Sequence, residues 1–374
     1  MFLVRERFKA LSPDKARVVR AITSCGTVLA GLHLRSCTEC GNEELAFNSC
    51  SNRHCPKCQG GQSFRWVQKR CSELLPVPYF HLVFTLPSEL RTLCYQNKRL
   101  IYDALLKSSA EAIQDAVRTK FKAEVGNFTV LHTWNQELSY HPHAHHVVPA
   151  CGFSTKDGKP MLLPKTEKFF ISTKVLSPLF RGKFISRLKE LYSQNQLRLY
   201  GSLKELEHPG NFNLYLAKAC RAEWVVYAKR PFASPEAVIK YLASYIHRVG
   251  ISSKRLLSFD NNKVTFLARC RKDKSKKKPF TLNAPEFCRR FLMHLLPKGF
   301  KRVRYFGFLR NHGRLNALKQ LREFLNSPTP LIEAPIKLSC PNCNSTKLNV
   351  RRIIKTHISR PYEPHTPTQF ANTS

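Results

Sequence analysis

The segment 140–149 constrains the fold of this chain more than any other. Its sequence, YHPHAHHVVP, places four histidines within six positions and ends in a β-branched pair. In a β-strand the side chains alternate between the two faces, so His143 and His145 point to the same side, about 6–7 Å apart. Two imidazoles in this arrangement can bind one metal ion. The pattern predicts a strand that carries a metal site; the alternative is a packed cluster of polar histidines that binds no metal.

Strand geometry narrows the choice of ligands. His141 shares a face with His143 and His145, but the two outer histidines would lie about 13 Å apart, too far to share one ion. His141 also precedes a proline at the expected start of the strand. We therefore expect His143 and His145 to be ligands, with Gln136 or Glu137 in the preceding segment as the third. A set of nitrogen and oxygen ligands suits either Mg²⁺ or Mn²⁺.

The chain carries a large excess of positive charge. Its 374 residues include 62 Lys and Arg but 25 Asp and Glu, which gives a formal net charge of +37. Such an excess destabilises a compact protein by self-repulsion unless a polyanion neutralises it, so nucleic acid is the expected partner. A ribosome-associated or merely basic protein is the alternative.

Two basic segments are candidates for contact with DNA phosphates. Residues 269–278 include seven basic side chains in ten positions, although a run of charge is also typical of solvated surface. Residues 298–304 interleave basic and aromatic side chains, as in segments that follow a nucleic-acid strand. The candidate DNA-binding residues are Arg269, Arg271, Lys272, Lys274, Lys276, Lys277, Lys278, Lys298, Lys301, Arg302 and Arg304.

The cysteines predict metal sites. The sequence has no run of about 18 apolar residues, the length that a transmembrane helix needs. The charged N-terminus lacks the apolar core of a secretory signal. We therefore expect a cytoplasmic protein, in which CxxC pairs bind metal rather than form disulfides. The first choice of ligands for a tetrahedral zinc site is Cys37, Cys40, Cys55 and Cys58.

Further sulfur and imidazole donors lie near these pairs and elsewhere. Cys50 and His54 either substitute for one of the four ligands or belong to a second site with Cys25. The pair Cys340 and Cys343 is half of a zinc site, and its second half is not evident in the sequence. In the alternative interpretation these cysteines are simply small buried residues.

The segment 234–250 predicts a helix with two tyrosines on one face. Ser234 is a suitable N-cap, Pro235 suits the first helical position, and Gly250 suits the end of the helix. Tyr241 and Tyr245 are four residues apart and so lie on the same face. Taken alone, two aromatic residues at this spacing are more typical of a core. Beside a metal ion that polarises a phosphate, a tyrosine can attack phosphorus and form a phosphotyrosine without ATP.

Apolar patterns predict further elements around the histidine segment. Strands are expected at 79–87, 128–134 and 224–231, and helices within 88–119, 179–192 and 285–295. A hairpin is expected between 256–259 and 264–268, with Asp260-Asn261-Asn262 as its turn.

Several of these segments together resemble one family. They are CSNRHCPKCQ at 50–59, LLPVPYFHLVFTLP at 74–87, HTW at 132–134 with Gln136, HPHAH at 141–145 with VVP at 147–149, YLASYIHRV at 241–249 and LPKGF at 296–300. In these segments the chain resembles the rolling-circle transposases of bacterial insertion sequences, the IS91 family, within the HUH endonuclease superfamily. The matching order extends over about residues 20–345, which chance does not explain.

The resemblance implies an α+β fold. A central antiparallel sheet flanked by helices is expected, preceded by a small zinc-binding domain and followed by a basic C-terminal region. We place a helical lead-in and zinc-binding domain at 1–75, an HUH-type nuclease domain at 76–260, a basic DNA-binding extension at 261–335, and the CPxC knuckle with a disordered tail at 336–374. Structural Zn²⁺ and catalytic Mg²⁺ or Mn²⁺ are the expected metals.

The resemblance also implies roles for single residues. The family's histidine–hydrophobic–histidine motif maps onto His143-Ala144-His145, and its catalytic tyrosines map onto Tyr241 and Tyr245, with a slight preference for Tyr245 as the first nucleophile. Gln136 stands seven residues before His143, a spacing that some superfamily members use for the third ligand.

The expected protein is a DNA transposase. The resemblance implies an enzyme that cleaves and rejoins single-stranded DNA through a 5′-phosphotyrosine during rolling-circle transposition. Its expected partners are single-stranded and hairpin DNA at element ends and target DNA, in the bacterial cytoplasm and at the nucleoid when bound. A replication initiator or relaxase with the same chemistry, and a non-catalytic zinc-dependent DNA-binding protein, are the alternatives.

Overall fold

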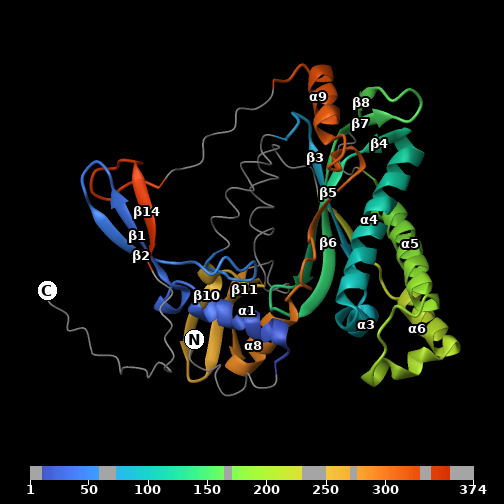
Figure 1. Cartoon of the computed structure of the whole chain (residues 1–374). Coiled ribbons are helices and arrows are strands. Elements are labelled where there is room, and N and C mark those ends of the chain that lie inside the picture. Colours follow the sequence, from blue (N-terminus) through green and yellow to red (C-terminus); the bar gives the residue numbers. More distant parts are fainter. Residues whose placement is uncertain are drawn as a thin grey trace. The chain divides into compact units, whose positions relative to one another are not determined.

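A computed structural model describes residues 11–58, 73–163, 171–229, 250–269, 276–328 and 338–353. The chain divides into two compact units (Figure 1). The first joins Leu3–Cys58 with Pro335–Ser374, and the second is Gln59–Ala334. The C-terminal CPxC knuckle, predicted as a segment of its own with the tail at 336–374, therefore belongs to the same unit as the N-terminal cysteines.

The first unit is a small three-stranded sheet with one helix. Helix α1 (Pro13–Ser24) begins with a proline in its first turn, and a short 3₁₀ turn (Val28–Ala30) follows. Strands β1 (Leu32–Cys37), β2 (Glu43–Phe47) and β14 (Leu348–Ile353) form a sheet in the order β14-β1-β2. Both pairings are antiparallel, so a C-terminal strand completes a sheet that begins near the N-terminus.

The second unit is built on a five-stranded sheet in the order β13-β5-β6-β3-β9. All four pairings in this sheet are antiparallel, as the predicted fold class requires. The strand that carries the histidines, β6, is the central one. The bounds of the strands are β3 Tyr79–Thr85, β5 Asn127–Trp134, β6 Tyr140–Pro149, β9 Val226–Lys229 and β13 Val303–Phe306.

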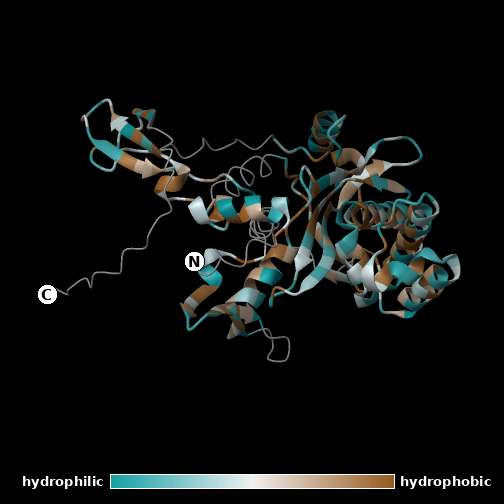
Figure 2. Cartoon of the chain, turned by 60° about the horizontal axis from the view of Figure 1, so that its bottom comes forward, coloured by the Kyte–Doolittle hydropathy of each residue, from teal (hydrophilic) through white to brown (hydrophobic). Residues whose placement is uncertain are grey.

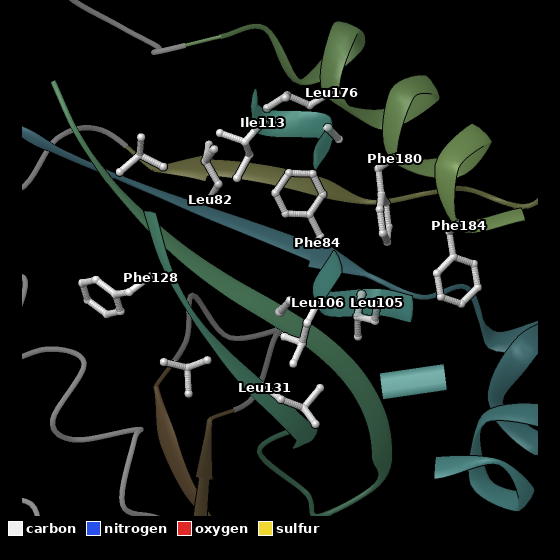
Figure 3. Close-up of a cluster of buried hydrophobic side chains, with 14 of the residues drawn as sticks. Leu82, Phe84, Leu105, Leu106, Ile113, Phe128, Leu131, Leu176, Phe180 and Phe184 are labelled. Carbon is white, nitrogen blue, oxygen red and sulfur yellow. The ribbon is translucent and has the colours of Figure 1, made fainter. Parts of the chain in front are cut away.

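Helices α4 (Lys98–Phe121) and α5 (Thr173–Ser193) pack on one face of this sheet. Apolar side chains from the two helices meet alternate residues of β3, Leu82 and Phe84 (Figure 3). Phe84 of β3 lies edge-on to Phe180 of α5, with ring centroids 5.2 Å apart. Because strand side chains alternate, residues next to Phe84 in the sequence face the opposite side of the sheet.

The other elements of the second unit extend this core. They are a 3₁₀ turn (Ser88–Leu90), α3 (Arg91–Gln96), a 3₁₀ segment (Gly201–Glu207), α6 (Pro209–Arg221), a 3₁₀ turn (Gly307–Leu309) and α9 (Arg314–Phe324). A second small sheet has the order β4-β7-β8, formed by Ala123–Val125, Cys151–Ser154 and Pro160–Leu162. In Figure 2 the helices carry both hydrophilic and hydrophobic residues, as expected for helices with one face on a sheet.

A third sheet carries the first basic segment. A 3₁₀ turn (Ser253–Arg255) leads into β10 (Leu256–Asp260), which pairs with β11 (Lys263–Arg269), and β12 (Lys277–Asn283) follows on the other side of β11. Asn261 and Asn262 have positive φ angles of 46° and 59°, the backbone that a tight hairpin turn needs. Helix α8 (Ala284–Met293) covers this sheet through Phe287 and Phe291.

Most of the predicted elements are present with shifts of a few residues at their ends. The expected strand at 79–87 is β3, and the expected helical segment at 88–119 becomes α3 and α4. The predicted tyrosine helix at 234–249 lies outside the described residues. None of the helices in the described ranges is long and apolar enough to cross a membrane.

Candidate functional site

Three histidines from two neighbouring strands meet on the five-stranded sheet. His143 and His145 lie two residues apart on β6, and His132 lies on β5 directly opposite His143 in the antiparallel register. Each offers a ring nitrogen, and these nitrogens all lie within 4.8 Å of one another. His132 is 2% exposed, and His145 is 8% exposed. Such a cluster can bind one metal ion while protein covers most of its ligands.

The structure adds one candidate ligand that the sequence did not single out. His132 joins the pair on β6, and the assignment of Gln136 as a ligand stays a prediction. Gln136 is exposed in the turn between β5 and β6, and its backbone carbonyl accepts a hydrogen bond from Arg255. Spacing along the chain favoured Gln136, whereas antiparallel pairing brings a residue eleven positions before His143 directly across from it.

Hydrogen bonds fix the orientation of the rings on β6. Nδ1 of His143 lies 2.7 Å from the carbonyl oxygen of His141. A carbonyl can only accept, so Nδ1 donates, and the lone pair of a neutral His143 ring is on Nε2. His141 therefore contributes its backbone carbonyl to the site.

A fourth histidine supports His145. Nε2 of His81, on β3, lies 2.8 Å from Nδ1 of His145, and the two rings stack with centroids 5.1 Å apart. His81 is fully buried. If Nδ1 of His145 donates to His81, Nε2 of His145 carries the lone pair that a metal needs. Metal-ligating histidines commonly use the second ring nitrogen in this way.

His146 belongs to the opposite face of the sheet. Its ring is fully buried, with Nε2 2.8 Å from Oγ of Ser109 on α4 and Nδ1 3.0 Å from Oδ1 of Asn127. Burial lowers the pKa of His146 to about 3. His146 thus lies apart from His143 and His145 and is a neutral core residue.

The donor set is richer in nitrogen than the sequence indicated. Three imidazoles suit Mn²⁺ and the later divalent ions of the first transition row better than Mg²⁺, which prefers oxygen ligands. Three protein ligands leave coordination positions for substrate or water. The two predicted nucleophiles, Tyr241 and Tyr245, lie outside the described residues.

The cysteines form two clusters instead of one. Cys25, Cys50, Cys55 and Cys58 make the first cluster, and Cys37, Cys40, Cys340 and Cys343 make the second. The first choice of ligands, which paired Cys37 and Cys40 with Cys55 and Cys58, is therefore wrong. Cys37 and Cys40 lie at the turn of the β1–β2 hairpin, strand β2 separates them from Cys55 and Cys58, and each pair meets other cysteines. The alternative that joined Cys50 to Cys25 agrees with the first cluster.

His54 lies beside the first cluster but is not one of its four donors. Its side chain is 4% exposed, and its backbone amide donates to Oδ1 of Asn52 at 2.9 Å. In the first cluster, sulfur atoms of Cys25 and Cys58 are 3.4 Å apart, and those of Cys50 and Cys58 are 3.6 Å apart. These distances suit four sulfurs around one tetrahedral zinc ion better than a disulfide of about 2.05 Å.

Both clusters contain a thiol that ionises more easily than an ordinary cysteine; in the second cluster, backbone hydrogen bonds lower the pKa of Cys37 as well as that of Cys40. A hydrogen bond from the backbone of Asn42 is the main cause that lowers the pKa of Cys40 to about 6. Burial opposes ionisation of Cys58, but hydrogen bonds from Cys25 and Cys50 outweigh it and lower the pKa of Cys58 to about 7. Thiolates are the form of cysteine that binds zinc.

The candidate DNA-binding residues have different environments. On the third sheet, Arg269 lies directly opposite Lys277 across the β11–β12 pair, and Lys276, Lys277 and Lys278 are exposed. Arg271, Lys272 and Lys274 lie outside the described residues. Like charges directly opposite each other destabilise a sheet, so an anionic partner would relieve this pair.

The second basic segment is partly engaged within the protein. Lys298 and Lys301 are exposed, whereas Arg302 is partly buried at the start of β13. Arg304 forms an ion pair with Asp103 of α4, and its guanidinium lies 5.1 Å from the ring centroid of Phe300. These contacts favour a structural role for Arg304 over phosphate binding.

Comparison with known proteins identifies the family. A family model described as "Putative transposase" matches residues 126–316, and one described as "Transposase zinc-binding domain" matches residues 3–86. The chain is 42% identical to "Putative transposase y4qJ" of Sinorhizobium fredii over 90% of this chain and 84% of that protein. It is 26% identical to the transposase for insertion sequence element IS801 of Pseudomonas savastanoi pv. phaseolicola, over 84% of this chain and 75% of that protein.

Among solved structures, two of the conjugative relaxase TrwC in complex with oriT DNA are similar in part. One, copper-bound, has a TM-score of 0.26 and 16% identity over 51% of this chain and 71% of that chain. The other, metal-bound, has a TM-score of 0.27 and 12% identity over 62% and 87%. The family follows from the sequence relatives: the chain belongs to the IS91 family of transposases and has the family's N-terminal zinc-binding domain.

Proposed function

We propose that this transposase cleaves and rejoins single-stranded DNA through a 5′-phosphotyrosine intermediate, as in rolling-circle transposition of an insertion sequence. The observation that carries the proposal is the cluster of His132, His143 and His145 on the central strands of the sheet. Family membership supplies the substrate class, and the cluster supplies a place for a phosphate-activating metal. The tyrosines supply the nucleophile.

The divalent ion, when bound by the three histidines, would polarise the scissile phosphate and offset charge on the leaving oxygen. Mn²⁺ fits this nitrogen-rich donor set better than Mg²⁺. His143 and His145 would orient their Nε2 atoms toward the ion because His141 and His81 engage the opposite ring nitrogens.

The two tyrosines would exchange the DNA strands. The phenolic oxygen of Tyr241 or Tyr245 attacks phosphorus, the phosphotyrosine bond forms, the bond to the 3′-oxygen breaks, and the proton lost by the phenol is balanced by the one gained by the 3′-oxygen, which leaves as a hydroxyl. The released 3′-hydroxyl of a second strand then reverses the reaction and frees the tyrosine. Each exchange replaces one phosphodiester-type bond with another, so the reaction needs no ATP. Two tyrosines allow two strands to be held covalently at once.

The remaining parts of the chain would hold DNA. The zinc-binding domain is the proposed reader of hairpin or single-stranded element ends, and the exposed lysines of β12 would contact phosphates there or on target DNA. A protein with this activity would work in the bacterial cytoplasm and at the nucleoid.

A covalent-adduct assay tests the mechanism. Purified protein is incubated with labelled single-stranded element ends and Mn²⁺ or Mg²⁺, and the adduct is resolved by denaturing electrophoresis. We expect an adduct with the wild type, none with Tyr241→Phe/Tyr245→Phe, and none with His143→Ala, which should still bind DNA in a salt-sensitive manner. An adduct that persists in the double tyrosine variant would refute the proposed nucleophiles.

The same assay separates the alternatives. A non-catalytic DNA-binding protein would form no adduct with any metal. A relaxase or replication initiator would form one, but would cleave an origin sequence and not the ends of the element that encodes the protein.

A further inference from the structure

The second cysteine cluster joins residues that are 300 positions apart. Sγ of Cys40 lies 3.6 Å from Sγ of Cys340, and Sγ of Cys37 lies 3.6 Å from Sγ of Cys343. All four sulfurs lie within 4.8 Å of one another. With metal–sulfur bonds of about 2.3 Å, the sulfurs of a tetrahedral zinc site are separated by about 3.8 Å. A disulfide would need about 2.05 Å, so the spacing fits a shared ion.

The two halves of the cluster have the same backbone design. In the first, the amide of Gly41 donates to the carbonyl of Cys37 at 3.1 Å, and Gly41 has a φ of 69°. In the second, the amide of Asn344 donates to the carbonyl of Cys340 at 2.9 Å, and Asn344 has a φ of 57°. Each CxxC pair is thus a tight turn closed by a left-handed residue, and each turn aims two sulfurs at one point.

The surrounding sheet has little apolar burial to stabilise it. Of the residues in β1 and β2, only Cys37 is buried, while Leu45 and Phe47 are 61% and 52% exposed. On β14, Val350 is 62% exposed. Small domains without an adequate core are commonly stabilised by a metal or by disulfides. The cluster supplies four ligands where the sheet lacks a core.

We propose that Cys37, Cys40, Cys340 and Cys343 bind a structural Zn²⁺ ion, distinct from the ion of the Cys25 cluster, that fastens the C-terminal strand β14 to β1. The family's zinc-binding domain matches residues 3–86 and does not include Cys340 or Cys343. In this chain the zinc-binding unit is therefore composite: the second unit lies between its two parts in the sequence. The proposal concerns metal content and does not depend on the cleavage mechanism.

The amount of zinc that a mercurial reagent releases from the protein tests this assignment. The reagent displaces only thiolate-bound zinc and leaves imidazole-bound metal in place. The full-length wild type should release two equivalents per chain. The variants Cys340→Ser/Cys343→Ser and Cys55→Ser/Cys58→Ser should each release one. The matched control Cys220→Ser/Cys288→Ser, which removes cysteines outside both clusters, should release two.

A measurement on the unaltered protein keeps the proposal testable if a variant fails to fold. Cys40 and Cys343 are exposed, whereas Cys220 is only partly so. With zinc bound, we expect N-ethylmaleimide to modify Cys220 faster than Cys40 or Cys343, and a chelator to reverse that order. The assignment would be overturned if the wild type released one equivalent of zinc, or if Cys340→Ser/Cys343→Ser released two. It would also be overturned if N-ethylmaleimide modified Cys343 of the zinc-bound protein as fast as Cys220.

Discussion

Replacement of His81 should weaken metal binding without removing any ligand. Nε2 of His81 lies 2.8 Å from Nδ1 of His145, and the two rings are stacked. In His81→Phe an apolar ring can keep the stacking, but His145 loses this hydrogen bond. Loss of a partner that orients a metal-bound histidine typically costs 10–100-fold in metal affinity, or about 1.4–2.7 kcal/mol. The cost of a buried donor left without a partner, about 1–3 kcal/mol, has the same size.

Isothermal titration of the protein with Mn²⁺ measures this effect directly. We expect the dissociation constant to rise 10–100-fold in His81→Phe and to return most of the way in His81→Gln, whose amide can still bond to His145. Cleavage of single-stranded DNA should recover at high Mn²⁺, since all three ligands remain. His294→Phe is the matched control, because His294 is also fully buried but lies outside the cluster.

An unchanged Mn²⁺ affinity in His81→Phe would refute the reasoning, as would equal losses in His81→Phe and His294→Phe. The first result would mean that His81 only packs in the core. The second would mean that any loss of stability in this unit weakens the site.

Three further predictions concern stability and DNA binding. Burial lowers the pKa of His294 to about 4 from 6.5, so the unfolded state binds more protons than the folded state between these pH values. The free energy of unfolding should therefore fall by up to about 3 kcal/mol as the pH drops through this window. Thermal melts from pH 7 to 4 should show a smaller decline in melting temperature for His294→Phe than for the wild type. Gly307 has a φ of 58°, and a Cβ there would lie 1.8 Å from the backbone carbonyl oxygen of Val125. Gly307→Ala should therefore lower the free energy of unfolding, measured with denaturant, by more than about 2 kcal/mol. In the control Gly182→Ala, the new methyl group enters open space on a helix and should not lower it. Arg269→Gln/Lys277→Gln should reduce the slope of log K against log salt concentration for DNA binding, measured by filter binding, by an amount that corresponds to up to about two phosphate contacts. An unchanged slope would exclude both residues from the interface.

The sequence alone was sufficient for the fold class and for two of the three histidines. Apolar β-prone runs identified the strands, and within a strand a side chain's face depends only on the parity of its position. That rule placed His143 and His145 together on one face. The Asn261-Asn262 turn was equally local, since asparagine tolerates positive φ.

Pairing between strands decided the rest of the histidine site. His132 was visible as part of a predicted strand, but its role depended on the register of β5 against β6, which sets which residues face each other. Counting back from the short turn at 135–139 would have placed it near His143. His81 depended on a third strand, β3, whose position beside β6 no local pattern specifies.

The cysteines show the same division more sharply. Local spacing identified CxxC turns, each of which aims two sulfurs at one point, and it correctly predicted metal-binding chemistry for the N-terminal domain. It could not determine which turns share an ion, because a tetrahedral site is complete only when chain folding brings two turns together. The sequence by itself determined that Cys340 and Cys343 needed partners, and only the pairing of β14 with β1 decided that those partners are Cys37 and Cys40.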